Sequence, residues 1–253
     1  MPTYLPDTNV LIDIGRDPAV QTKLETAEQN GSKFVIAPSV MTELTVGVVK
    51  GGATYFGQNK KIFTWLQTHS DAILEPPRPF IGKILGFPSK WSQVEKHHRV
   101  QRVEMVANSQ TFDKFLKRKS DAGNVWSDID KAPQIHADKV DKEFTELENL
   151  AKSPQSTVDV VGMFCKTFAA GEVCADPELF KRHFSAAVEY VEASITKIRA
   201  GANPRKNDRG RYGDFQLFFY LADPNIILLT SEDFSDDIKQ SPQRTRIAGL
   251  DAL

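Results

Sequence analysis

The chain is poor in cysteine and has no long hydrophobic run. It holds two cysteines, Cys165 and Cys174, among 253 residues, which excludes a disulfide scaffold and favours free thiols in a reducing compartment. No stretch approaches the roughly 20 apolar residues that a membrane-spanning helix needs. The opening residues, MPTYLPDTNVLIDIGRD, lack the basic region and apolar core of a signal peptide. We therefore expect a soluble, cytoplasmic protein that does not bind a membrane.

A strong excess of charge of either sign is also absent. The formal net charge is −1, with 40% hydrophobic and 26% charged residues, as in ordinary globular proteins. This balance excludes a surface that is basic throughout, but it is compatible with a local basic patch beside an acidic pocket. No repeat of about 20–50 residues occurs, which excludes a solenoid.

Short apolar runs alternate with amphipathic segments in the first 75 residues. The pattern predicts strands at 3–6, 33–37 and 72–74, and later at 226–229 and, more weakly, 246–250. It predicts helices at 10–14, 18–29, 39–49 and 55–68, where Ser39 caps the third helix and Gly51-Gly52 ends it. Strands separated by helices of this length favour an α/β fold with a parallel sheet.

The middle of the chain has a different pattern. Residues 76–88 form a proline-rich connection that we expect to be irregular. Helical patterns follow at 92–118, 137–151, 156–169 and 177–200. The plainest interpretation is an α/β domain made of 1–75 and 206–253, with a predominantly helical insertion at 76–205. A separate helical domain inserted at the same place is a variant of this interpretation.

Acidic residues occur where α/β folds place their ligands, at or near the carboxyl ends of strands. Asp7 follows the first strand, Glu43 lies on the helix after the second, and a cluster follows the 226–229 strand. Asp214 begins the helix that leads into that strand. The cluster consists of Glu232, Asp233, Asp236 and Asp237. We expect several of these acids to share one pocket.

Grouped carboxylates repel one another and raise one another's pKa, so they are stable only beside a cation. Mg²⁺ and Mn²⁺ prefer such oxygen ligands, and one or two bound ions can promote hydrolysis of a phosphodiester bond. The absence of histidine or cysteine near these acids argues against zinc.

Each acid also has a purely structural explanation. Asp7 and Asp214 can cap helices, and Glu43 can be a solvated helix residue. The acids at 232–237 are common in a turn after a strand. Only their order along the chain favours a shared site.

That order resembles the PIN-domain ribonuclease family. LPDTNVLID at 5–13 looks like the family's opening motif, which carries its first metal-binding aspartate. PSVMTEL at 38–44 is similar to the second motif, with its glutamate at Glu43. GDFQL at 213–217 resembles the helix with the third acid, and LLTSEDF at 228–234 resembles the fourth motif. The resemblance covers about 1–75 and 207–250.

The resemblance implies a three-layer α/β/α fold and Mg²⁺- or Mn²⁺-dependent cleavage of RNA. It implies that Asp7, Glu43 and Asp214 are ligands, that Asn9 gives a supporting polar contact, and that Thr230 orders the last loop. The family usually has an aspartate two residues after this threonine. Glu232 fills that place here, so the fourth ligand is open among Glu232, Asp233 and Asp236.

Three basic segments are candidates for binding nucleic acid. The first lies just before Asp214 and would supply phosphate contacts, although a solvated linker would have the same composition. It consists of Arg205, Lys206, Arg209 and Arg211. In the second, Lys114–Lys119, basic residues at a helix C-terminus are favoured by the helix dipole alone. The third consists of Lys96-His97-His98-Arg99 with Arg102. The spacing of Arg99 and Arg102 predicts one positive helix face, which Glu95 and Glu104 dilute.

The leading hypothesis is a metal-dependent endoribonuclease in which water attacks the phosphorus and Glu43 is a ligand or orients the water. One alternative is a module that kept this fold, lost catalysis and binds nucleic acid or a protein. Another is a structure-specific DNA nuclease. The sequence leaves open whether the chain forms a homodimer and whether an inhibitor protein binds it.

Overall fold

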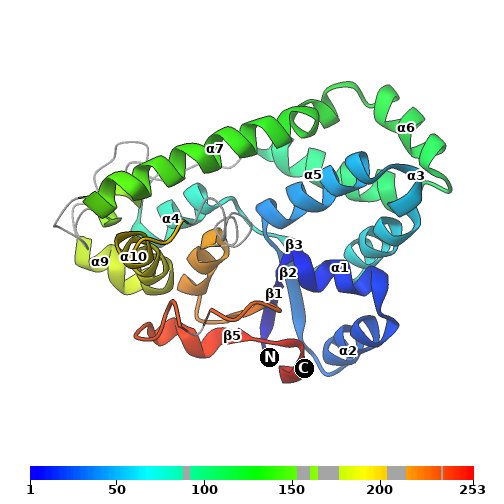
Figure 1. The fold of residues 1–253 in the computed structure, drawn as a ribbon. Helices are drawn as coiled ribbons and strands as arrows, with labels where there is room; N and C mark the ends of the chain where they lie inside the picture. The colour runs from blue at the N-terminus through cyan, green and yellow to red at the C-terminus, as the bar shows by residue number, and fades with distance from the viewer. Residues whose placement is uncertain (88–91, 153–159, 165–176, 204–214, 235) are drawn as a thin grey trace.

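The computed structural model describes residues 1–253 except 88–91, 153–159, 165–176, 204–214 and 235. At its centre five parallel strands form one sheet in the order β3-β2-β1-β4-β5 (Figure 1). The strands are β1 (Thr3–Pro6), β2 (Lys33–Ile36), β3 (Ala72–Ile73), β4 (Ile226–Leu229) and β5 (Ile247–Ala248).

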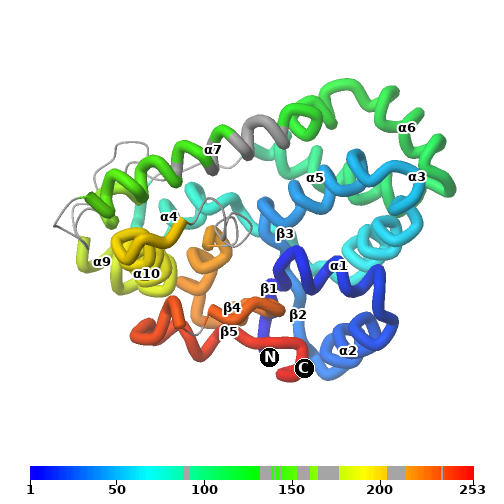
Figure 2. The backbone as a smooth tube through the Cα atoms, in the orientation of Figure 1, coloured from blue at the N-terminus to red at the C-terminus, as the bar shows by residue number. Residues whose placement is uncertain are grey.

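The central strand β1 joins the two ends of the chain. Tyr4 is paired with Phe34 of β2 on one side and with Ile227 of β4 on the other. Figure 2 shows the first and last segments of the chain side by side in this sheet. The strands are short runs of mainly buried apolar residues, as expected for a sheet covered on both faces. The predicted strands and their parallel arrangement are confirmed, and the bounds of β1 to β4 agree with the prediction to within one residue.

One face of the sheet is covered by the helices of the first third of the chain (Figure 1). These helices are α1 (Thr8–Arg16), α2 (Pro18–Gln29) and α3 (Pro38–His69). The two helices predicted at 39–49 and 55–68 are joined in α3, which is kinked at Gly52 (φ 63°, ψ −163°). Ser39 is not a cap, because α3 begins after Ala37 with Pro38 in its first turn, a position that suits the fixed φ of proline.

The other face is covered by aromatic-rich elements (Figure 1). They are α4 (Pro77–Leu85), α9 (Pro177–His183), α10 (Ser185–Arg199) and the 3₁₀ helix η2 (Phe215–Ala222). Phe215, Phe218 and Phe219 are buried here, as expected for core residues. With a helical layer on each face, the predicted three-layer α/β/α architecture is confirmed.

Two predicted features of the middle segment are wrong. Residues 76–88 are not irregular throughout, because α4 forms there with Pro77 in its first turn and ends at left-handed Gly86, as is typical of helix ends. The helix predicted at 92–118 is divided into α5 (Gln93–Ala107) and α6 (Phe112–Asp121). The Thr111 side chain accepts a bond from Lys114 N and caps α6, so a local polar side chain starts a new helix.

The longest helix after α3 is α7 (Ser127–Lys152), which follows a short 3₁₀ helix, η1 (Gly123–Trp126). It begins ten residues before the predicted start at 137, and Asp128 and Asp130 in its first turn suit the helix dipole. α7 contacts α3 and α10 and passes beyond the end of the sheet at which α1 begins (Figure 1). It therefore connects the two helical layers near the carboxyl ends of the strands.

The remaining expectations for the middle segment are tested only in part. The segment predicted as a helix at 156–169 is described only at 160–164, where it is helical. The helix predicted at 177–200 is divided into α9 and α10. Between 77 and 203, the described residues include no strand. The division into an α/β domain and an insertion stays a prediction.

The structure bears only in part on two expectations, the state of the cysteines and the absence of a membrane-spanning helix. Cys165 and Cys174 lie outside the described residues. Among the residues that are described, no helix combines the length and the apolar character required to cross a membrane.

Candidate functional site

Asp7 lies at the carboxyl end of β1 and is almost fully buried, with 2% of its surface exposed. It is the N-cap of α1, as its place in the sequence predicted, and its Oδ1 accepts a bond of 2.7 Å from Val10 N. Its Oδ2 accepts a bond of 2.5 Å from the Thr230 hydroxyl, 223 residues away in the chain. Capping therefore engages only one of the two carboxylate oxygens.

Thr230 connects Asp7 to the acidic loop that follows β4. Parallel pairing of Pro6 with Leu229 sets Asp7 beside Thr230. Thr230 Oγ1 accepts a bond of 3.0 Å from Glu232 N while its hydroxyl hydrogen is donated to Asp7. One side chain thus orders the loop and orients the aspartate.

The environment of Asp7 disfavours its charged form. Burial raises the pKa of the Asp7 carboxyl, and the negative charge of Glu232 raises it further. Hydrogen bonds from Thr230 and Val10 act in the opposite direction but do not cancel the effect of burial. A cation beside Asp7 would remove this electrostatic cost.

Glu43 lies near the start of α3 and contacts the residue that follows Asp7. The Thr8 hydroxyl donates a hydrogen bond to Glu43 Oε2. The structure therefore brings the second predicted acid close to the first through a shared neighbour. The expected supporting residue, Asn9, is exposed on α1, and its supporting contact stays a prediction.

The four acids after β4 differ in their surroundings. Asp236 is 86% exposed and forms an ion pair of 3.0 Å with Lys239. Asp237 is buried and forms an ion pair of 2.6 Å with Lys197. Glu232 and Asp233 line a cavity of about 650 Å³ that also reaches Thr230 and Arg244. Neither Asp7 nor Asp236 lines this cavity. Of the candidates for the fourth acid, Glu232 is the one whose charge acts on the pKa of Asp7.

Five predicted site residues lie outside the described residues. They are Arg205, Lys206, Arg209, Arg211 and Asp214. Phe215, which follows Asp214 in the chain, stacks on Tyr190 at 6.5 Å between ring centroids. Tyr190 also contacts Phe234 at 5.9 Å, and Phe234 lies two residues after Glu232. The described start of η2 is thus linked through one ring to the acidic loop.

The two arginines of the third basic segment are buried, whereas Lys96 and His97 of the same segment are exposed. Arg99 and Arg102 were predicted to form one positive helix face, but they are 9% and 4% exposed. Arg99 Nη1 donates to Pro38 O at 2.9 Å, and Arg102 Nε donates to Val125 O at 2.7 Å. The prediction is wrong because these guanidinium groups bind backbone carbonyls between helices, where they join α5 to α3 and η1.

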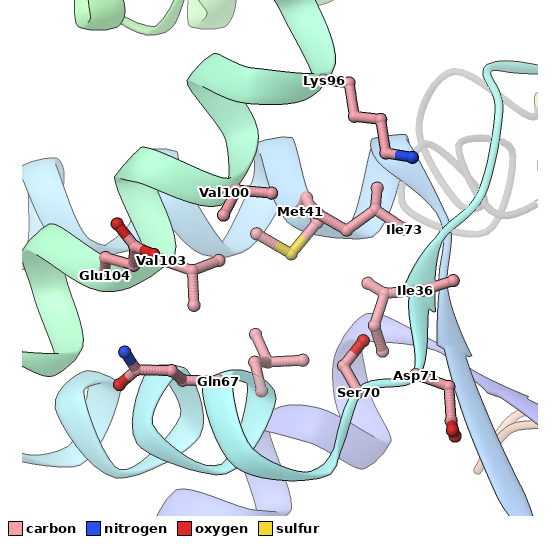
Figure 3. A pocket seen from close by; sticks show the side chains of 12 residues that line it. Ile36, Met41, Gln67, Ser70, Asp71, Ile73, Lys96, Val100, Val103 and Glu104 are labelled. Carbon is pink, nitrogen blue, oxygen red and sulfur yellow. The ribbon is translucent and has the colours of Figure 1, made fainter.

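A second cavity, of about 300 Å³, opens beside the carboxyl ends of β2 and β3 (Figure 3). Met41, Val100 and Val103 point into it, with Lys96 at one end and Gln67 and Glu104 at the other. Its walls are mainly apolar, and none of the predicted acids lines it. It is therefore distinct from the acidic cavity.

The donors around Asp7 are carboxylate and hydroxyl oxygens, which fit Mg²⁺ or Mn²⁺ rather than a metal that prefers nitrogen or sulfur. Among the residues that the structure describes, no group of three or more acidic, histidine or cysteine side chains is close enough to hold a metal. Asp214, predicted as one ligand, lies outside that set. The described residues therefore support a metal through the chemistry and charge of the donors around Asp7, and not through a complete set of ligands.

Comparison with family models, with curated proteins and with solved structures finds no match to this chain. The resemblance to PIN-domain ribonucleases consequently stays a prediction from the sequence motifs.

Proposed function

We propose that this chain is a Mg²⁺- or Mn²⁺-dependent nuclease that hydrolyses phosphodiester bonds, with RNA as its substrate. The observation that supports it most is the environment of Asp7. The Asp7 carboxylate is 2% exposed and lies near Glu232, and its pKa is raised. Its ionised form therefore destabilises the fold unless a cation lies beside it. Perturbed pKa values of this kind are concentrated at functional sites.

The position of the acids supports the same proposal. Asp7 and the Thr230–Asp233 loop follow adjacent parallel strands, and the carboxyl ends of such strands are where open α/β sheets bind ligands. Glu43 joins this group through Thr8. Two of the four sequence motifs are thus in hydrogen-bond contact with each other through Asp7 and Thr230, and a third is connected through Thr8.

In the proposed site, Asp7, Asp214 and one or both of Glu232 and Asp233 would hold the metal. A bound Mg²⁺ or Mn²⁺ would stabilise the charge that develops on the phosphoryl group. Thr230 would keep the Asp7 carboxylate in one orientation, and Thr8 would do the same for Glu43. Glu43 would then be a further ligand, or it would orient the attacking water as the phosphorus–oxygen bond breaks.

The decisive experiment is a cleavage assay on labelled single-stranded RNA in Mn²⁺, with the same sequence as DNA and a flapped DNA duplex in parallel. Asp7→Asn should lower the rate about a hundredfold or more, because it removes the charge that holds the metal. Asp13→Asn is the matched control, since Asp13 is an acid of the same helix α1 and lies outside the site.

Equal rates for Asp7→Asn and the unchanged chain would refute the proposal. Cleavage of DNA alone would replace RNA by DNA as the substrate. No cleavage, together with no heat on titration with millimolar Mn²⁺, would instead favour a binding module that has this fold without catalysis.

A further inference from the structure

A short 3₁₀ helix, η3 (Pro242–Arg246), is fixed next to the acidic cavity by hydrogen bonds on both sides of Arg244. Gln243 is buried, and its Nε2 donates to His183 O at 2.6 Å and to Leu221 O at 3.0 Å. Arg246 Nη1 donates to Asp223 O at 2.6 Å. Ser241 caps the helix by accepting a bond of 3.1 Å from Gln243 N. The backbone on either side of Arg244 is therefore firmly held.

Arg244 itself differs from these neighbours. It is exposed, and it lines the cavity of about 650 Å³, whose lining includes Thr230 and three acids, Glu232, Asp233 and Asp251, but not Asp7. The ion pairs found among the described residues do not include Arg244. The fold thus presents a guanidinium group, from a rigid turn, in a cavity with an acidic wall.

We propose that Arg244 and this cavity form a binding site for the phosphodiester backbone of a nucleic-acid strand. The proposal rests on the proposed function, because it places a contact with the substrate in the cavity next to that site, on the far side of Thr230 from Asp7. A carboxylate-lined cavity repels a polyanion, so a strand that enters it needs a positive partner close by. Arginine stays charged at any physiological pH, and its planar fork fits two oxygens of one phosphate.

A simpler role for Arg244 would be to balance the charges of Glu232, Asp233 and Asp251. The two roles predict different results. A charge-balancing arginine would alter thermal stability and leave strand binding unchanged. A phosphate-binding arginine would alter strand binding and its salt dependence, with little effect on stability because the side chain is exposed.

The test is fluorescence anisotropy with a labelled single-stranded RNA, measured in EDTA and separately in Ca²⁺ so that binding is recorded without Mn²⁺. Arg244→Gln should weaken binding about tenfold, as expected for the loss of a charge-assisted hydrogen bond. The slope of log affinity against log salt should fall by about 0.7 for a single strand. Arg244→Lys should recover part of the affinity, because it keeps the charge and loses the fork.

Arg16→Gln is the matched control, because Arg16 is an exposed arginine at the far end of α1; it should bind as the unchanged chain does. Equal affinity of Arg244→Gln and the unchanged chain would overturn the inference, and so would absence of RNA binding by the unchanged chain. If the unchanged chain binds RNA but does not cleave it in Mn²⁺, the proposed nuclease fails and the comparison at Arg244 still decides the inference.

Discussion

At the scale of single residues, stability of the metal-free fold favours the neutral form of the buried Asp7 carboxyl, whereas the proposed metal site needs its charged form. The pKa of Asp7 is raised, chiefly by burial, so the folded protein binds its proton more tightly than the unfolded chain does. Its contribution to stability is fully present below the pKa of an unfolded aspartate, about 3.9, and is lost as the pH rises through the raised value. At neutral pH the ionised group therefore destabilises the metal-free fold.

Asp7→Asn should consequently make the metal-free protein more stable at neutral pH, while it abolishes cleavage. The gain over the unchanged chain should grow as the pH rises from about 4 through the raised pKa of Asp7 and should then level off. Urea unfolding in EDTA at a series of pH values measures this difference. A variant that is less stable than the unchanged chain at neutral pH would show that loss of the bond from the Thr230 hydroxyl to Asp7 Oδ2 outweighs removal of the buried charge.

Thr230 allows a second test at the same scale. Thr230→Val keeps the shape of the side chain but removes the donor to Asp7 Oδ2 and the acceptor for Glu232 N. Loss of these bonds in a buried site should cost about 1–3 kcal/mol of unfolding free energy and weaken Mn²⁺ binding measured by calorimetry. Thr22→Val is the control, since Thr22 is exposed and bonds only the Pro18 carbonyl of its own helix. Unchanged Mn²⁺ affinity would remove Thr230 from the site.

At the scale of elements, the glycine pair in α3 predicted the position of a break correctly, but the break is a kink within one helix and not the end of a helix. Gly51-Gly52 marked the break correctly, but the chain resumes as a helix at once after a single non-helical residue, Gly52. A glycine pair indicates where backbone freedom is available. Whether the next segment continues or turns away depends on what it packs against, which here is α5.

The kink predicts opposite effects for two glycines of the same helix. Gly52 has φ 63° and ψ −163°, a region that is almost exclusive to glycine, so Gly52→Ala should cost about 1–3 kcal/mol. Gly57 has helical backbone and nothing within 4 Å of an added Cβ, so Gly57→Ala should stabilise by about 0.5–1 kcal/mol. Thermal unfolding of both variants tests this, and destabilisation of equal size in both would contradict the kink.

At the scale of the whole molecule, the sequence predicted the sheet well and the contacts between distant helices poorly. Short apolar runs separated by helices specify parallel strands, and parallel strands bring their carboxyl ends to one edge. Asp7 and Thr230 could be expected together for that reason. The Thr8–Glu43 bond and the bond from Arg99 to Pro38 depend on the angles at which helices pack, which residue spacing does not specify.

The proposed metal should act on parts of the molecule that are far apart in the chain. A cation held by Asp7 and the loop after β4 binds only the folded state, so Mn²⁺ at a hundred times its dissociation constant should add about 2.7 kcal/mol. For a chain of this size that corresponds to a melting temperature higher by roughly 5–10 °C. The increase should be lost in Asp7→Asn and kept in Asp13→Asn.

Hydrogen exchange would locate this effect. Mn²⁺ should slow exchange of the amides of Val10 and Glu232 together, because their bonds end on Asp7 and Thr230, respectively, and Thr230 bonds Asp7 in turn. Protection at one of these segments without the other would mean that the ion is held by a single loop. Protection limited to the exposed pair of Asp236 and Lys239 would place the ion outside the proposed site and would separate metal binding from Asp7.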